Sequence, residues 1–175
     1  MALEFPHLLP PPSGTTVEVA PGVLWLRMPL PFQLDHINLW ALRDGDGWTL
    51  VDTGFADEGT RSAWVAVLAG LAGPVRNLLV THFHPDHLGL ATWLLEQTGA
   101  QLWMTAAEFL TAHAVWHEVG GHGARFMTEQ FRQHGLSADL LDRFARRGSG
   151  YTRSVPALPE RYNRLQAGDS RAIGG

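Results

Sequence analysis

Residues 75–97 contain the feature that most restricts how this chain folds. An apolar run, VRNLLVT at residues 75–81, is typical of a buried strand. Residues 88–97 then repeat leucine and alanine at helical spacing. A polar run rich in histidine lies between them. A strand followed at once by a helix is the unit of α/β proteins, so we expect layers of helix and sheet.

The same alternation continues on both sides of this unit. We expect strands at 16–30, broken by a turn at Pro21-Gly22, and at 36–42, 48–51 and 101–104, with a helix over 57–70. Residues 44–47, DGDG, predict a hairpin turn. Residues 105–147 predict two or three helices with breaks at 120–123 and 135–137, followed by a loop over 148–162 and a short hairpin over 164–175. The predicted organisation is a Pro-rich arm at 1–14 and one domain at 15–175, in which 105–147 form a helical insertion or lid.

Composition excludes several kinds of chemistry. The 175 residues include no Cys, which removes disulfides, thiolate metal ligands and a cysteine nucleophile. All 13 basic residues are Arg, so there is no Schiff-base or P-loop lysine. The net charge of −4 offers no broad basic surface, so no nucleic-acid partner is expected. No stretch is long and apolar enough to predict a membrane span, and we expect a cytoplasmic protein.

The histidine-rich run carries the clearest chemical signal. It reads THFHPDHLG and places His82, His84, Asp86 and His87 within six residues. His82 and His84 are two apart at the end of a strand, where both project to one side, and Asp86 and His87 open the next helix. Imidazole nitrogen and carboxylate oxygen suit Zn, Fe or Mn. The run therefore predicts two ligand pairs that hold two metals side by side.

This run resembles the H-x-H-x-D-H signature of the metallo-β-lactamase-fold hydrolases. Residues 50–54, LVDTG, are similar to the strand-ending L-V-D-T-G element of that family, and residues 38–42 followed by the Asp-Gly turn resemble its N-terminal hairpin. The resemblance covers roughly residues 17–104 and resumes at 165–175. It implies an αββα four-layer sandwich, of which this chain supplies about the first half.

The resemblance also assigns roles to individual residues. His82 and His84 would bind the first metal, Asp86 and His87 the second, and Asp52 would orient the ligand loop from behind. Asp86 is also the expected catalytic residue, because it would help to orient the attacking water. The implied cofactors are two divalent metals, zinc first and Fe or Mn as alternatives.

The family uses seven ligand positions for two metals, and this sequence shows four of them. A third His for the first metal, a bridging Asp and a last His for the second are expected nearer the C-terminus, and the chain ends at Gly175. We therefore expect a truncated domain with a wide apolar sheet face. Missing sequence, a complementing C-terminal segment or a second copy in a homodimer would cover that face.

Other histidines offer weaker alternatives. His113 and His117 share a helix face, but Ala114 stands where a zincin motif requires Glu. His122, in a GGHG turn, loosely resembles the missing ligand loop, and His36 is expected at the pocket mouth.

The helical segment 105–147 has two open interpretations, a lid over the substrate pocket or simple packing at the edge of the sheet. Arg143, Arg146 and Arg147 form either an anion site or, as the preferred interpretation, a solvated helix end.

The resemblance implies a hydrolase of the glyoxalase II kind, with a small ester, thioester or lactone as substrate and attack by metal-bound hydroxide. Catalysis would require the absent C-terminal ligands, and the isolated chain is expected to be inactive. The alternative is a non-catalytic fragment or assembly module with incomplete metal sites.

Overall fold

The structure, a computed structural model, describes residues 3, 6–7, 9–147 and 150–174, with seven strands and seven helices among them. The strands are β1 (Thr16–Ala20), β2 (Val23–Pro29), β3 (His36–Asp44), β4 (Gly47–Val51), β5 (Val75–Leu79), β6 (Gln101–Thr105) and β7 (Asn163–Leu165). The helices are α1 (Glu58–Gly70), α2 (Pro85–Leu88), α3 (Ala91–Thr98), α4 (Ala106–Trp116), α5 (Ala124–Gln133), α6 (Ala138–Arg147) and α7 (Tyr151–Ser154).

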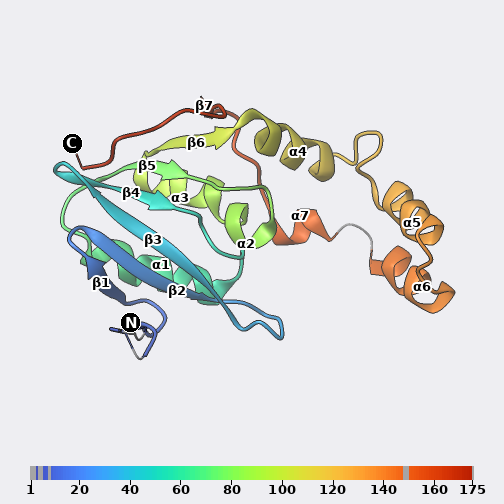
Figure 1. Cartoon of the computed structure of the whole chain (residues 1–175), viewed down its shortest axis with the longest axis horizontal. Helices are drawn as coiled ribbons and strands as arrows, with labels where there is room; N and C mark the ends of the chain where they lie inside the picture. Colours follow the sequence, from blue (N-terminus) through green and yellow to red (C-terminus); the bar gives the residue numbers. More distant parts are fainter. Residues whose placement is uncertain (1–2, 4–5, 8, 148–149, 175) are drawn as a thin grey trace.

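All seven strands form one sheet in sequence order (Figure 1). The first four are antiparallel neighbours, as expected from their short turns, and β4 to β7 are parallel. Parallel neighbours need a crossover, which the helical segments between them provide. The predicted α/β class is confirmed.

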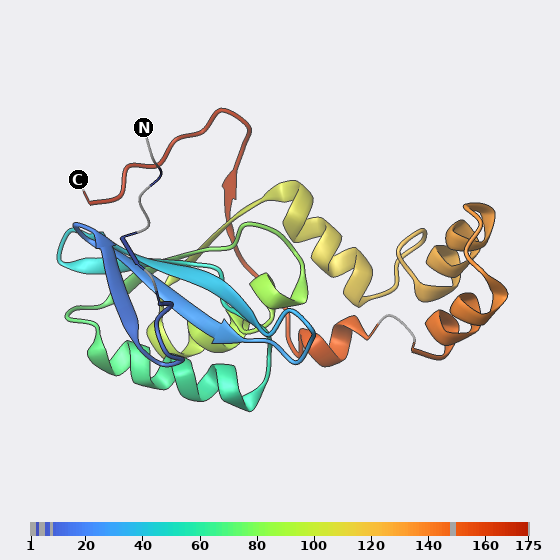
Figure 2. The same ribbon diagram turned by 60° about the horizontal axis from the view of Figure 1, so that its bottom comes forward.

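Helices α1 and α3 cover one face of the sheet, behind the strands in Figure 1 and below them in Figure 2. Helix α1 begins where the Asp57 side chain accepts a hydrogen bond from the Thr60 amide. Trp64 on this helix is fully buried, and its indole N–H donates to the Thr53 carbonyl at 2.7 Å. The strands contribute fully buried side chains to the same core: Leu26, Leu39, Leu50, Leu78 and Met104.

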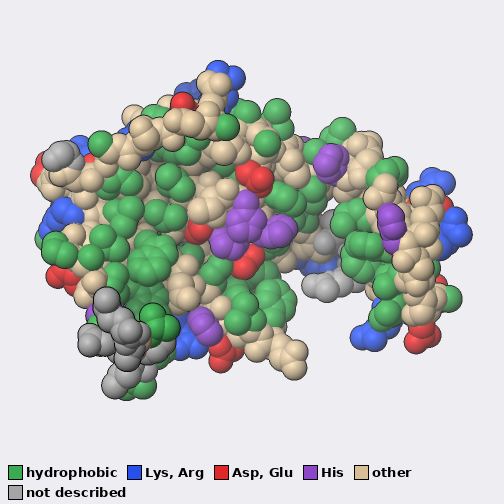
Figure 3. Space-filling model, in the orientation of Figure 1, with side chains coloured by type: hydrophobic (Ala, Val, Ile, Leu, Met, Phe, Trp, Pro, Cys, Tyr) green, Lys and Arg blue, Asp and Glu red, His purple; other side chains and the backbone are tan. Residues whose placement is uncertain are grey.

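The opposite face of the sheet carries a half-buried apolar row. The strand register aligns Trp25 with Trp40, Trp40 with Val51, Val51 with Leu79, and Leu79 with Trp103. Figure 3 shows hydrophobic side chains spread over this face. Among the residues that the structure describes, no helix covers this row. The sheet and its helix layer therefore correspond to one α/β half of the expected four-layer sandwich.

Two expectations for the C-terminal region are wrong. Residues 148–162 were expected to be a loop, but the short helix α7 lies within them, where Tyr151 and Val155 are buried in the core. Residues 164–175 were expected to form a hairpin. Instead β7 pairs in parallel with β6, and a turn closed by the Asp169 amide and the Gln166 carbonyl leads to no second strand in the described part. Local spacing could not predict either feature, since both depend on contacts with distant residues.

The helical segment agrees with the sequence. Helices α4, α5 and α6 are separated near residues 120–123 and 135–137, as predicted, and α5 and α6 pack on each other and project away from the sheet (Figure 1). None of the helices in the described ranges has the length and apolar character needed to cross a membrane.

Replacing Trp64 tests the packing of α1. Trp64→Ala removes a fully buried ring and its hydrogen bond, and we expect it to lower the free energy of unfolding by about 3–5 kcal/mol. Val65→Ala is the matched control on the same helix, where the side chain is 59% exposed, and it should change stability by no more than about 0.5 kcal/mol. Urea unfolding followed by circular dichroism measures both. Equal losses in the two variants would contradict the packing described.

Candidate metal-binding site

The predicted ligand residues come together at the carboxyl end of β5. The strand ends at Leu79, earlier than expected, so His82 and His84 lie in the loop that follows it. Asp86 and His87 lie at the start of α2, as predicted, with Pro85 at its first position. Figure 3 shows histidine side chains gathered at the centre of the sheet's open side. We call residues 81–87 the ligand loop.

Asp52 holds this loop from the neighbouring strand. It follows β4 directly, is 6% exposed and has a φ of 63°, a left-handed conformation that Asp adopts more readily than most residues. Its Oδ1 accepts a hydrogen bond from the Thr81 amide at 2.8 Å, and its Oδ2 lies 2.9 Å from His87 Nδ1. A carboxylate only accepts, so His87 Nδ1 carries a proton, and in the neutral ring Nε2 keeps its lone pair.

Thr81 is a functional residue that the sequence interpretation missed. Its hydroxyl lies 2.9 Å from Asp52 Oδ2 and 3.0 Å from His82 Nδ1. The hydroxyl proton goes to the carboxylate, so His82 Nδ1 donates to the hydroxyl oxygen and His82 Nε2 keeps its lone pair. Asp52 therefore fixes the tautomers of two histidines, one directly and one through Thr81. The only signal for Thr81 in the sequence was its place beside His82.

The ligand-type atoms form two pairs. His82 Nε2 lies 3.1 Å from His84 Nδ1, and His87 Nε2 lies 3.5 Å from Asp86 Oδ2. In a tetrahedral zinc site with bonds of about 2.0–2.1 Å, neighbouring ligand atoms are about 3.3 Å apart. Each pair therefore fits one edge of such a site. No group of three or more His, Asp or Glu side chains that could hold one metal is found within the described ranges, so each pair is only part of a ligand set.

The electrostatics of the two inner histidines differ. Burial lowers the pKa of His82, and the neighbouring rings of His87 and His84 lower it further. Burial by itself also lowers the pKa of His87, but the Asp52 carboxylate outweighs this effect and raises that pKa above its ordinary value. His82 is thus kept neutral at pH 7, the form that binds metals.

Further backbone contacts fix α2 against the Asp52 segment. The Thr53 amide and hydroxyl both donate to the His87 carbonyl, at 2.9 and 2.7 Å, and the Leu90 amide donates to the Thr53 hydroxyl. Gly89 lies in this contact, where an added Cβ would be 2.8 Å from the Gly54 carbonyl oxygen. Glycine is therefore required there for the two segments to approach each other.

The other side of the ligand loop is held at Phe83. Its amide donates to Glu108 on α4 at 3.0 Å, and its carbonyl accepts from the Tyr151 hydroxyl on α7 at 2.6 Å. Burial raises the pKa of Tyr151, which keeps this hydroxyl protonated as a donor. Neither Glu108 nor Tyr151 was identified from the sequence, because both lie far from the loop along the chain.

A cavity of about 630 Å³ opens beside the ligand loop. We call it the hairpin pocket, because the helical hairpin of α5 and α6 forms part of its wall. His84 and Asp86 line it on one side, and residues from α4, α5, α6 and α7 line the other. His122 also lines it. His36 does not line it; its Nδ1 lies 2.6 Å from Asp35 in a separate cavity beside the N-terminal prolines.

The remaining candidates lie elsewhere. His113 Nε2 is 3.2 Å from the Pro159 carbonyl, and His113 stacks on His117 along α4. Arg146 pairs with Asp142 at the exposed surface of α6, as a solvated helix end predicts, and the side chain of Arg147 lies outside the described residues.

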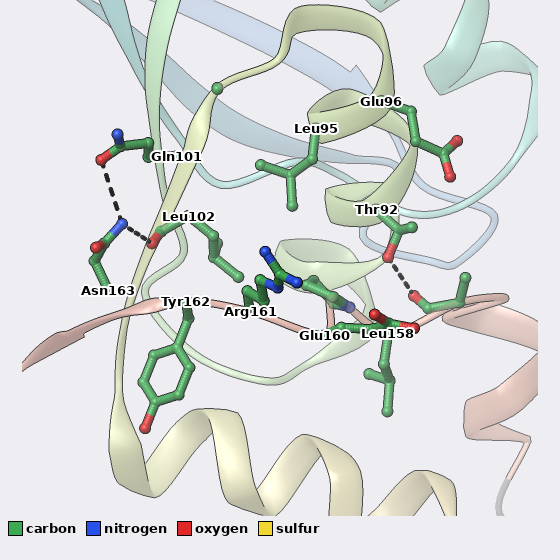
Figure 4. Close-up of a pocket in the computed structure, with 13 residues that line it drawn as sticks. Thr92, Leu95, Glu96, Gln101, Leu102, Leu158, Glu160, Arg161, Tyr162 and Asn163 are labelled. Carbon is green, nitrogen blue, oxygen red and sulfur yellow. Dashed lines mark hydrogen bonds between the residues drawn. The ribbon is translucent and has the colours of Figure 1, made fainter.

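A larger cavity of about 960 Å³ lies between α3, β6 and residues 157–163 (Figure 4). Thr92 and Asn163 in its wall are already hydrogen-bonded to the Ala157 and Leu102 carbonyls. Its lining residues include Glu96, Glu160 and Arg161 but no histidine, so its size does not make it the candidate site.

The fold and the ligand loop together define an α/β protein whose histidine- and aspartate-lined site lies at the carboxyl ends of its parallel strands. The chain belongs to the metallo-beta-lactamase superfamily, whose family model matches residues 33–153.

Two solved structures show the same fold. A beta-lactamase domain protein from Burkholderia ambifaria is 43% identical with a TM-score of 0.77, over 97% of this chain and 49% of that one. A metallo-beta-lactamase family protein from Thermus thermophilus is 27% identical with a TM-score of 0.69, over 90% of this chain and 50% of that one. The chain thus spans about half the length of these relatives. No curated protein matches it.

Removing the Tyr151 hydroxyl tests the support of the ligand loop. Tyr151→Phe leaves the Phe83 carbonyl without its donor, and we expect a loss of about 1 kcal/mol in the free energy of unfolding, with faster amide exchange at Phe83. Tyr162→Phe is the control, since its ring stacks on Phe109 and the substitution keeps that contact. Urea unfolding and hydrogen exchange measure the effects. Unchanged exchange at Phe83 in Tyr151→Phe would contradict the proposed anchoring.

Proposed function

We propose that this chain provides the metal-binding half of a binuclear, zinc-type hydrolase that cleaves a small ester, thioester or lactone. One observation carries the proposal: two pairs of ligand atoms, 3.1 and 3.5 Å apart, lie on one loop beside a cavity. Membership of the metallo-beta-lactamase superfamily supports the hydrolase class. Zinc, the binuclear character and the substrate class are part of the proposal, with Fe or Mn as alternative metals.

The residues present fit two divalent ions. His82 and His84 would hold one, and Asp86 and His87 the other. Two such ions would supply Lewis-acid polarisation of the carbonyl and a nucleophile derived from water at neutral pH.

The chain's own groups perform the positioning. Asp52 keeps the proton on His87 Nδ1 and, through Thr81, on His82 Nδ1, so that both Nε2 atoms face the site as acceptors. The Asp86 carboxylate lies beside His87 Nε2 and also lines the pocket. It can therefore accept a hydrogen bond from the attacking water and orient that water. The pocket wall positions the substrate beside these groups and excludes bulk water from it.

The remaining ligands are proposed to come from outside the described residues, either from a complementing C-terminal segment or from a second copy. The half-buried Trp25 and Trp40, over which no helix of the described residues packs, support an added layer on that face. A cytoplasmic location, a small-molecule substrate and the absence of a nucleic-acid partner stay predictions from the sequence.

A second function is favoured by the incomplete ligand sets. With two ligand atoms in each pair and no third within the described part of the chain, a non-catalytic metal-binding or assembly module is the alternative.

Metal analysis combined with an assay separates the two functions. We expect the chain, once a complementing C-terminal segment or a second copy supplies the remaining ligands, to bind two equivalents of zinc. It should then hydrolyse members of a thioester, ester and lactone panel in a manner abolished by chelator and by His82→Ala. Elemental analysis after gel filtration and steady-state kinetics measure this. Metal binding without turnover would establish the assembly module, and turnover that survives chelation would contradict the hydrolase proposal.

Neutralising Asp52 tests its positioning role. Asp52→Asn keeps the size and the tolerance for a positive φ but removes the charge that fixes His87, and metal affinity should fall about 10–100-fold. Asp46→Asn is the control, since Asp46 is exposed and pairs with Arg76 away from the loop. Calorimetric zinc titration measures both. Equal affinities in the two variants would show that Asp52 does not act through the ligands.

A further inference from the structure

The hairpin pocket is lined mainly by apolar side chains, among them five phenylalanine and tyrosine rings. Two of them, Phe32 and Phe55, pack edge to face with centroids 5.4 Å apart in the loops after β2 and β4. The Phe83 ring of the ligand loop lies 6.1 Å from the Tyr151 ring, centroid to centroid. Phe144 on α6 and Met127 on α5 complete the far wall. At about 630 Å³, the cavity falls within the range of small-molecule sites.

Three hydroxyl groups line this wall, and two of them, those of Tyr151 and Ser154, donate hydrogen bonds within the protein; the third is that of Thr111 on α4. The Tyr151 hydroxyl donates to the Phe83 carbonyl at 2.6 Å, and the Ser154 hydroxyl donates to the Gly150 carbonyl at 3.2 Å. These two side chains therefore present mainly their apolar surface to the cavity.

The charges in the wall are also few. No arginine is among the described residues that line the pocket, and the chain contains no lysine. The ionisable groups are His84 and Asp86 of the ligand loop, His122 from the turn before α5, and the Tyr151 phenol held as a donor. An anionic group placed under α5 and α6 would find no arginine or lysine among the described lining residues, and desolvating it would be costly.

The two described arginine side chains of α6 do not change this balance. Arg143 lines a separate cavity with Phe131 and Leu140. Arg146 is turned to solvent, where it pairs with Asp142.

We propose that the hairpin pocket binds an uncharged apolar acyl group, a medium-length alkyl chain or an aromatic ring, with the scissile carbonyl at His84 and Asp86. This inference rests on the proposed hydrolase function for the carbonyl, and it narrows the substrate class to esters or thioesters of apolar acids. Binding of the acyl group itself needs only the pocket wall, so it is measured without metal or turnover.

The probe is N-methyloctanamide, an uncharged amide that a hydrolase of esters leaves intact. Two related amides serve as comparisons. One is N-methylacetamide, which lacks the alkyl chain, and the other is the analogue of N-methyloctanamide whose alkyl chain ends in a carboxylate. The readout is the methyl resonance of Met127 in the chain labelled at methionine. Met28 and Met104 are fully buried in the sheet core and serve as internal references.

We expect the octanamide to shift the Met127 methyl saturably while Met28 and Met104 stay unchanged. It should bind at least about tenfold more tightly than either comparison, because only it buries a whole apolar chain. Equal affinity for the short amide or for the carboxylate-ended amide would overturn the inference, as would an unmoved Met127 resonance.

Two variants of α5 locate the binding. Ala124→Trp fills the pocket wall and should weaken octanamide binding about tenfold or more, with the Met28 and Met104 resonances reporting that the core is intact. Phe126→Ala removes a ring that is 48% exposed and does not line the pocket, so binding should be unchanged. The reverse order of effects would overturn the inference.

Zinc binding and the Met127 response together distinguish failure of the acyl-pocket proposal from failure of the metal-site proposal. His82→Ala should lose zinc and keep octanamide binding. Normal zinc binding with no response of Met127 in the wild-type chain would refute the acyl pocket alone. A normal response of Met127 in a chain that binds no zinc would refute the metal proposal alone.

Discussion

The Asp52 carboxylate is the constraint on which the candidate site depends. It lies just beyond β4 with a positive φ and accepts hydrogen bonds from the backbone and side chains of the ligand loop beyond β5. Parallel pairing of β4 and β5 places these two strand ends side by side, so the sheet itself provides the distance that the carboxylate spans. Without that charge, His87 would lose the acceptor that fixes its tautomer, and the Thr81 hydroxyl would lose the acceptor that orients it toward His82. The contacts of Thr53 and Phe83 would still hold the loop in place.

The two faces of the sheet have different roles. On one face, α1 and α3 bury the large apolar side chains and hold the strands rigidly, which gives the site a fixed base. The other face shows its tryptophan row beside the ligand loop. The helical segment extends the site in a different direction, since α4 and α7 anchor Phe83 and α5 and α6 close an apolar cavity beside His84. The ligand residues and the pocket thus lie at the carboxyl ends of the parallel strands, between the sheet and the helical segment (Figure 1).

Sequence patterns predicted most of the strands and helices along the chain and identified four candidate ligand residues, because each depends on local periodicity or spacing. Metal binding by these four residues stays a prediction. The patterns failed for α7 and for the expected C-terminal hairpin, which are decided by burial of Tyr151 against the core and by pairing of β7 with β6. The sequence interpretation missed the roles of Thr81, Glu108 and Tyr151 for the same reason. These roles arise from contacts with residues that are distant in the sequence and that folding brings near. The described residues hold no third ligand for either pair and no helix over the open face, and no local pattern specifies what would complete either.

The most direct test of this account is nitrogen-15 NMR of the histidine rings during zinc addition, because it reports which atom of each ring binds. The structure predicts coordination by Nε2 of His82, Nδ1 of His84 and Nε2 of His87, with the proton on His87 Nδ1 retained by Asp52. His113, His117 and His122 should be unaffected. Zinc bound at His87 Nδ1, or at the α4 histidines in place of the ligand loop, would contradict the account.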